Sequence, residues 1–232
     1  MSIIRALICA APLLALALPA TALAQPAGGQ WSGAIEIASD NRSKGVSKSN
    51  GQPFVSGLIE WESASGSWFI QGEVETVDRG AGGDIEIGTM IGIRPQIAGF
   101  DMTFAIEHEQ MLRGLPGGRD SQWQVIARAR RGIGPATATV RLEHTPRSIT
   151  NGGHSTWAEA EVGWAVSPRT EVSAAIGRRE QELGADYTAW NAGVTFALTR
   201  TIDLDVRYYD NSERDLGRAY ERRLVAGFAV FF

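Results

Sequence analysis

Apolar and polar residues alternate along nearly the whole chain after residue 30. Between residues 136 and 143, for instance, Ala, Ala, Val and Leu take every second position, and Thr, Thr, Arg and Glu take the positions between them. Successive side chains of a β-strand point to opposite faces, so this period of two predicts strands, and no stretch fits helical spacing better. The pattern predicts an all-β chain of twelve strands, the first starting near Trp31 and the last ending at Phe232.

The predicted strands have one apolar face and one face that carries most of the charge. A soluble two-sheet sandwich would bury the apolar faces against each other and expose the charged ones, and the alternation alone leaves this alternative open. A closed antiparallel barrel in a membrane would do the reverse. Because hydrocarbon offers no partner to an open sheet edge, the first strand of such a barrel must pair with the last.

The connections between the predicted strands alternate in length. Long connections cover residues 41–53, 110–120, 145–155, 180–187 and 210–219, whereas short ones lie near residues 64–66, 95–99, 132–135, 167–169 and 199–200. Long extracellular loops, short periplasmic turns and an even number of strands are typical of bacterial outer-membrane barrels. This spacing favours a closed transmembrane β-barrel with both ends on the periplasmic side. The connection 78–83 is the exception, because it is short but lies at the end where the other connections are long.

Large aromatic residues fall at the two ends of the apolar faces. Those at the short-turn end are Trp31, Trp61, Trp68, Phe100, Trp164 and Phe232, and those at the loop end are Trp123, Trp190 and Tyr208. Amphipathic rings favour the interfaces of a bilayer, so we expect two aromatic girdles in contact with lipid. Trp157 breaks the pattern, because its position points inward. The terminal Phe232 resembles the signal read by the barrel assembly machinery, which we expect as a partner.

The first 24 residues have the features of a cleaved secretory signal peptide. A short basic start precedes an apolar run of about 15 residues, too short for a spanning helix, and small residues occupy the cleavage positions. We therefore expect residues 1–24 to be a leader, residues 25–30 a short lead-in and residues 31–232 one barrel domain. The single cysteine, Cys9, lies in the leader, so the mature chain has no disulfide.

The charged face of the predicted strands would line the inside of the barrel. We expect the lumen to be bordered by Glu36, Glu60, Glu73, Glu75, Glu86, Glu107, Arg128, Arg130, Arg141, Glu159, Glu161, Arg179, Asp205, Arg207 and Arg223. An acidic wall facing a basic one would set up a field across a water-filled pore. Barrels of about eight strands are filled and those of about sixteen are open, so a narrow pore and an interior closed by Glu–Arg pairs both fit.

Two stretches resemble a known family. Residues 39–53, Ser-Asp-Asn-Arg-Ser-Lys-Gly-Val-Ser-Lys-Ser-Asn-Gly-Gln-Pro, resemble the opening signature of the TorF-type porins, and residues 186–194, Asp-Tyr-Thr-Ala-Trp-Asn-Ala-Gly-Val, resemble their late motif. Asp203-Leu204 with Tyr208-Tyr209-Asp210 is similar to the strand that follows. The departures are Asn41 in place of an aromatic residue, Lys44 in place of Arg and Lys48 in place of Gln. The resemblance implies a bacterial outer-membrane porin but no particular solute.

Candidate enzymatic chemistry is sparse. His108, His144 and His154 lie on different segments and lack the spacing of metal ligands. We therefore expect no metal site, no cofactor, no catalytic residue and no enzymatic activity. The alternative is an outer-membrane phospholipase in which His144 or the His154-Ser155 pair acts on the lipid-facing wall.

Charge adds expectations about partners. A formal net charge of −4 gives no sign of nucleic-acid binding. Arg42, Lys44 and Lys48 crowd the first long connection, where we expect a solvated loop, with lipopolysaccharide phosphates as the alternative partner. The chain as a whole predicts an outer-membrane channel for passive diffusion of small hydrophilic solutes. A structural or plugged barrel that does not conduct is the rival hypothesis.

Overall fold

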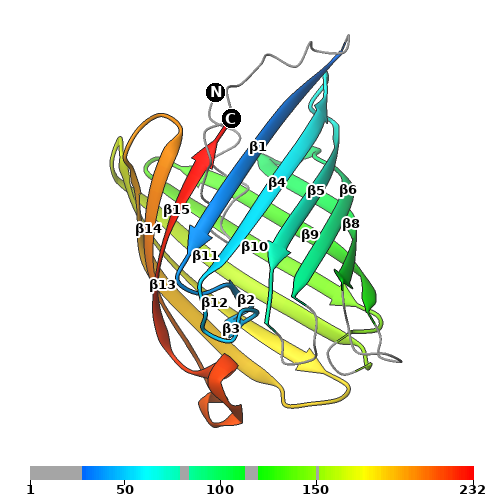
Figure 1. Ribbon diagram of the computed structural model, residues 1–232. Helices are drawn as coiled ribbons and strands as arrows, with labels where there is room; N and C mark the ends of the chain where they lie inside the picture. Colours follow the sequence, from blue (N-terminus) through cyan, green and yellow to red (C-terminus); the bar gives the residue numbers. More distant parts are fainter. Residues whose placement is uncertain (1–27, 79–83, 113–119, 150–151) are drawn as a thin grey trace.

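The chain forms a closed antiparallel β-barrel, as the alternation predicts (Figure 1). The computed structural model describes residues 28–78, 84–112, 120–149 and 152–232. The barrel strands are β1 (Gly29–Ala38), β4 (Phe54–Ser63), β5 (Trp68–Thr76), β6 (Ile85–Ile93), β8 (Phe100–Leu112), β9 (Ser121–Ile133), β10 (Ala136–Thr145), β11 (Ser155–Ser167), β12 (Thr170–Gln181), β13 (Tyr187–Ala197), β14 (Ile202–Asn211) and β15 (Arg223–Phe231). The predicted leader lies outside the described residues.

Closure comes from pairing of the first barrel strand with the last. β1 and β15 run antiparallel in a register that sets Ala34 opposite Phe231 and Ala38 opposite Gly227. Beyond that ladder, the backbone N–H of Phe232 donates to Gly33 O at 3.0 Å, and the Gly33 N–H donates to Phe232 O at 2.9 Å. The sheet therefore has no open edge between these two strands. A sheet surrounded by hydrocarbon must be closed in this way, because an open edge would leave backbone groups without hydrogen bonds.

The side chains alternate between a polar interior and an apolar exterior. On three neighbouring strands the outward Val140, Val162 and Ile176 are each more than half exposed. Most of the buried side chains are polar or charged, and the buried apolar ones form three small clusters. An apolar surface of this extent is not tolerated in water. The sandwich alternative is therefore wrong, because the apolar faces do not pack against each other.

The aromatic residues predicted for the girdles lie on the outer face in two groups. At the short-turn end the rings of Trp61 and Trp68 pack 4.6 Å apart between centroids, and at the loop end those of Trp190 and Tyr208 lie 5.4 Å apart. Trp157 points inward, as its position requires, and is only 3% exposed. The described part of the chain contains no helix of the length and hydropathy that membrane crossing requires.

Several small elements were not predicted. β1 begins at Gly29, two residues before the expected start. Two-residue strands β2 (Arg42–Ser43) and β3 (Val46–Ser47) pair within the first long connection, and β7 (Gln96–Ile97) pairs with β8 at a short turn. The last long connection contains the 3-10 turns η2 (Arg214–Leu216) and η3 (Arg218–Tyr220). Period-two alternation cannot reveal such short elements, because two or three residues are too few to establish a repeating pattern.

Candidate functional site

The candidate site is the inner wall of the barrel. The residues expected to border the lumen all lie on the inner face: Glu36, Glu60, Glu73, Glu75, Glu86, Glu107, Arg128, Arg130, Arg141, Glu159, Glu161, Arg179, Asp205, Arg207 and Arg223. Register makes Arg128 and Arg141 direct cross-strand neighbours and places Glu159 on the other side of Arg141. The acids of β1 to β8 and the arginines of β9 and β10 therefore form separate regions of one wall.

Residues 39–53, here called the inner loop, fold into the barrel at its loop end (Figure 1). β2 and β3 form a hairpin in this loop whose two central residues, Lys44 and Gly45, have φ of 53° and 76°. Two successive positive φ values are typical of the tight type I′ turn, which glycine accepts without strain. The hairpin presents Lys44 at its tip.

Asp40 organises the inner loop from within. Its carboxylate accepts hydrogen bonds from Ser47 Oγ at 2.5 Å, Ser49 Oγ at 2.9 Å and Arg42 Nε at 2.7 Å. Arg223 of β15 lies 3.7 Å away. The carboxylate is fully buried, and such a group is stable only when donors and opposite charges surround it. Asp40 therefore fixes the shape of the loop and ties it to the wall.

Two lysines of the inner loop bind the acidic wall. Lys44 Nζ lies 2.5 Å from Glu143 Oε2 and donates to Gln124 Oε1 at 3.2 Å. Lys48 Nζ forms an ion pair with Glu75 and contacts Glu86 Oε1 at 2.5 Å. The expectation of a solvated loop is therefore wrong for this segment: Arg42, Lys44 and Lys48 face buried acids and carbonyl groups. The two ammonium groups thus bring positive charge to carboxylates that are buried in the wall.

The inner loop also contacts the wall on the side away from the acidic strands. Val46 packs against the cluster of Trp157, Tyr187 and Ala189, which explains the inward position of that tryptophan. A Cβ on Gly45 would come within 2.1 Å of the Ala189 side chain, so only glycine fits there. Arg42 donates to Glu221 O at 2.7 Å, in the connection that precedes β15. The inner loop thus crosses the lumen and touches the wall on several sides.

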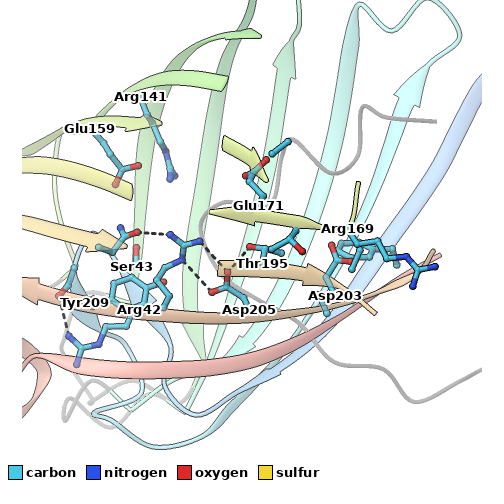
Figure 2. Close-up of a pocket in the computed structure, with 18 of the residues that line it drawn as sticks. Arg42, Ser43, Arg141, Glu159, Arg169, Glu171, Thr195, Asp203, Asp205 and Tyr209 are labelled. Atoms are coloured by element: carbon cyan, nitrogen blue, oxygen red, sulfur yellow. Dashed lines mark hydrogen bonds and ion pairs between the residues drawn. The ribbon is translucent and has the colours of Figure 1, made fainter. Parts of the chain in front are cut away.

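Beneath the inner loop the interior contains two cavities. The first has a volume of about 360 Å³ and extends from Arg42 and Lys44 to the short turns, along β11 to β15 (Figure 2). The second, of about 210 Å³, lies on the acidic side. Both are bordered by Ser43, Lys44, Arg141 and Glu159. The tip of the inner loop and these two wall residues therefore separate two compartments of the same lumen.

The two cavities differ in their chemistry. In the first, Arg207 donates to Asn191 Oδ1 at 2.8 Å and to Ser173 Oγ at 2.9 Å. It also pairs with Asp205, which borders this cavity (Figure 2). In the second, carboxylates outnumber bases: Glu60, Glu73, Glu75, Glu107, Glu109, Glu159 and Glu161 face Lys44, Lys48, Arg128 and Arg141. The lumen therefore has charged and polar groups in both cavities and an excess of carboxylates on one side.

Arg94 occupies the short-turn end of the acidic side. It donates to Glu60 Oε1 at 2.9 Å and Oε2 at 2.7 Å, binds Glu62, and lies 3.9 Å from the centre of the Phe69 ring. The bidentate pair and the stacked ring hold the guanidinium in a single position. Glu143, Glu109 and Arg94 were not predicted as site residues. Their inward positions on otherwise regular strands and turns were the signal available in the sequence.

The outer wall carries the histidines considered for hydrolysis. His144 Nδ1 lies 3.0 Å from Thr156 Oγ1, so the neighbouring hydroxyl belongs to a threonine, not to Ser155. His154 contacts Glu182 Oε2 through its ring at 3.0 Å and through its backbone N–H at 3.2 Å, and these hydrogen bonds lower the pKa of the Glu182 carboxyl. Ser155 instead accepts a hydrogen bond from Arg179 inside the barrel. The serine–histidine pair of the phospholipase hypothesis is therefore not formed.

A family model described as "Bacterial protein of unknown function (Gcw_chp)" matches residues 23–226, so the chain belongs to this family. The resemblance to TorF-type porins is supported at the level of a porin-like barrel and not as a family label. No curated protein matches the sequence significantly.

Several solved structures share the fold. The KdgM porin has a TM-score of 0.58 at 9% identity and covers 87% of this chain and 99% of its own; it has also been solved in complex with disordered oligogalacturonate. The NanC porin has a TM-score of 0.56 at 8% identity, and the match covers 89% of this chain and 99% of the NanC chain. An outer-membrane channel from Pseudomonas putida F1 has a TM-score of 0.50 at 13% identity, with 94% and 100% covered. The chain therefore has the fold of outer-membrane porins.

Proposed function

We propose that this member of the Gcw_chp family is an outer-membrane channel through which small hydrophilic solutes diffuse passively. The observation that carries the proposal is a closed barrel with an apolar exterior and polar cavities inside. Its strands have nine to thirteen residues, and a tilted strand needs about 9–11 residues to cross a bilayer. An enzymatic role finds less support, because the wall histidines lack a serine partner. Export by the predicted leader and the TorF-like loop signature are consistent with this placement.

The proposed partners follow from the outer surface. The two aromatic groups would lie at the interfaces of the lipid bilayer. Phe232, at the end of the strand pairing, would present the C-terminal aromatic to the barrel assembly machinery. Arg178 and Arg222 are exposed at the loop end, where guanidinium groups could reach lipopolysaccharide phosphates. Arg42, Lys44 and Lys48 do not serve that role, since they bind inside the barrel.

The charge of the lumen supports a preference for cations. Acids outnumber bases around the second cavity. Rings of carboxylates select cations in channels. Oligogalacturonate, which the KdgM porin binds, is a chain of carboxylates. An anionic polymer would meet repulsion on the acidic side here, so we propose a solute class of opposite charge.

A rival function is a plugged barrel that conducts nothing. It is favoured by one observation, namely that the inner loop contacts β5, β6, β10 and the last long connection at once. The cavities beneath the loop argue for the channel, because a purely structural barrel needs no hydrated space. The two hypotheses differ in whether solutes pass between the inner loop and the wall.

Planar-bilayer recording of the refolded mature protein tests the proposal. We expect discrete conductance steps and, in a salt gradient, a reversal potential that shows preference for K⁺ over Cl⁻. A mock preparation without the protein controls for contaminating pores. Repeated insertion of folded barrels without any steps would instead favour the plugged barrel.

A further inference from the structure

A line of inward polar residues crosses four neighbouring strands at the loop end. Register places Glu86 on β6 beside Glu75 on β5, Glu75 beside Ser56 on β4, and Ser56 beside Glu36 on β1. All four are buried, and we call them the acidic row. Side chains directly opposite each other on neighbouring strands lie about 4.5–5.5 Å apart at Cβ, and like charges in that arrangement repel. The row therefore requires positive charge to be stable in its ionised form.

One half of the acidic row already binds an ammonium group. Lys48 Nζ of the inner loop contacts carboxylate oxygens of both Glu75 and Glu86. Asn41, also in the inner loop, donates to Glu75 Oε2 at 2.7 Å. This half shows how the wall receives a primary amine: two carboxylates from adjacent strands converge on one nitrogen.

The other half of the acidic row has no partner among the residues that the structure describes. Glu36 is completely buried, and within those residues neither of its carboxylate oxygens accepts a hydrogen bond. The buried hydroxyl of Ser56 beside it also has no hydrogen-bond partner. The charged groups that act most strongly on Glu36 are themselves carboxylates, those of Glu73 and Asp205. A buried anion in such surroundings is costly unless a cation joins it.

The geometry points to a binding subsite for a primary ammonium group, formed by Glu36 and Ser56 next to the position of Lys48. The three unpartnered acceptors, two carboxylate oxygens and one hydroxyl, equal in number the three N–H donors of such a group. Ala229, the next residue along the same line on β15, borders the first cavity. The subsite thus lies in the wall, one strand away from the lining of the first cavity. In the described residues no three His, Cys, Asp or Glu side chains gather as a metal site, which favours an ammonium over a metal ion.

This subsite deepens the channel proposed above and rests on it, because it names the solute class as small amines that carry a positive charge. An entering amine would exchange water for Glu36 and Ser56, beside the ammonium of Lys48. The ammonium of Lys48 would then bind one half of the acidic row, and the ammonium of the solute would bind the other half. No covalent step is involved.

Heat unfolding of the full mature barrel in detergent tests the subsite directly. Methylammonium chloride and tetramethylammonium chloride carry the same charge, but only the first has N–H donors. At equal ionic strength, we expect methylammonium to raise the midpoint of the loss of β-sheet circular dichroism by a few degrees in a saturable manner, and tetramethylammonium to have no such effect. Ligands that bind only the folded state shift the midpoint in this way.

Three variants complete the experiment. Glu36→Gln should abolish the methylammonium shift and Ser56→Ala should reduce it, whereas Glu171→Gln, an inward carboxylate at the short-turn end, should leave it intact. An unchanged shift in Glu36→Gln and Ser56→Ala would overturn the subsite, as would no shift in the wild type. A methylammonium-specific shift without conductance steps would contradict only the proposed channel. Conductance steps without the shift would contradict only the subsite.

Discussion

Replacing both lysines of the inner loop, Lys44→Gln with Lys48→Gln, should raise the single-channel conductance several-fold and lengthen the open periods. The two ammonium groups hold the loop to Glu143, Glu75 and Glu86, and ion-paired hydrogen bonds are roughly twice as strong as neutral ones. Glutamine keeps the length and polarity of the side chains but removes the charge. The loop should keep its shape, because the contacts of Asp40 are untouched.

A charge-matched control separates release of the loop from a change in net charge. Arg200→Gln with Arg218→Gln removes two exposed basic groups away from the lumen, and we expect wild-type conductance. If the Lys44/Lys48 variant also conducted like the wild type, the inner loop would not be the constriction. If the wild type were silent and only the Lys44/Lys48 variant conducted, the plugged barrel would be the resting state.

Reversing the basic wall, Arg128→Glu with Arg130→Glu, should increase the K⁺ over Cl⁻ permeability ratio several-fold. Both side chains face the lumen, and Arg128 lies directly beside Arg141 in the register. The substitution turns the side of the wall opposite the acids from positive to negative, which makes carboxylates line more of the pore. The measurement is the reversal potential in a KCl gradient.

The matched control for this variant is Arg178→Glu with Arg222→Glu. It changes the net charge equally, but on exposed side chains at the loop end. We expect a permeability ratio close to that of the wild type, since surface charge is screened over about 8–10 Å at ordinary salt. Equal shifts in the two variants would show that Arg128 and Arg130 act through overall charge and not from the wall of a pore.

The barrel could be predicted from the sequence because its two environments require apolar and polar side chains to alternate along every strand. Lipid outside and polar space inside leave each strand position a single class of side chain, as in the run from Ala136 to Glu143. Closure followed from the same physics, because a free edge has no partner in hydrocarbon. The inward position of Trp157 was also correct, and its departure from the girdles reflected its contact with the inner loop.

The inner loop could not be predicted, because a buried loop and a solvated one have the same local pattern. What folds it inward is long-range: Lys44 meets Glu143, nearly a hundred positions away, and Arg42 meets the backbone of Glu221. The excess of inward acids on the first strands was the available signal. Such a wall needs counter-charges, and the nearest basic residues in sequence were those of the loop. Arg94 follows the same logic at the other end of the barrel.

Cysteine scanning of β10 in lipid vesicles tests most directly whether lipid covers the apolar face and water reaches the polar one. Residues 25–232 contain no cysteine, so single cysteines can be placed at residues 138–142 of a chain without its first 24 residues. A charged, membrane-impermeant thiol reagent should modify cysteines at Thr139 and Arg141, which border the cavities, and spare those at Ala138, Val140 and Leu142. Modification of the apolar positions with protection of the polar ones would contradict this assignment of the two faces.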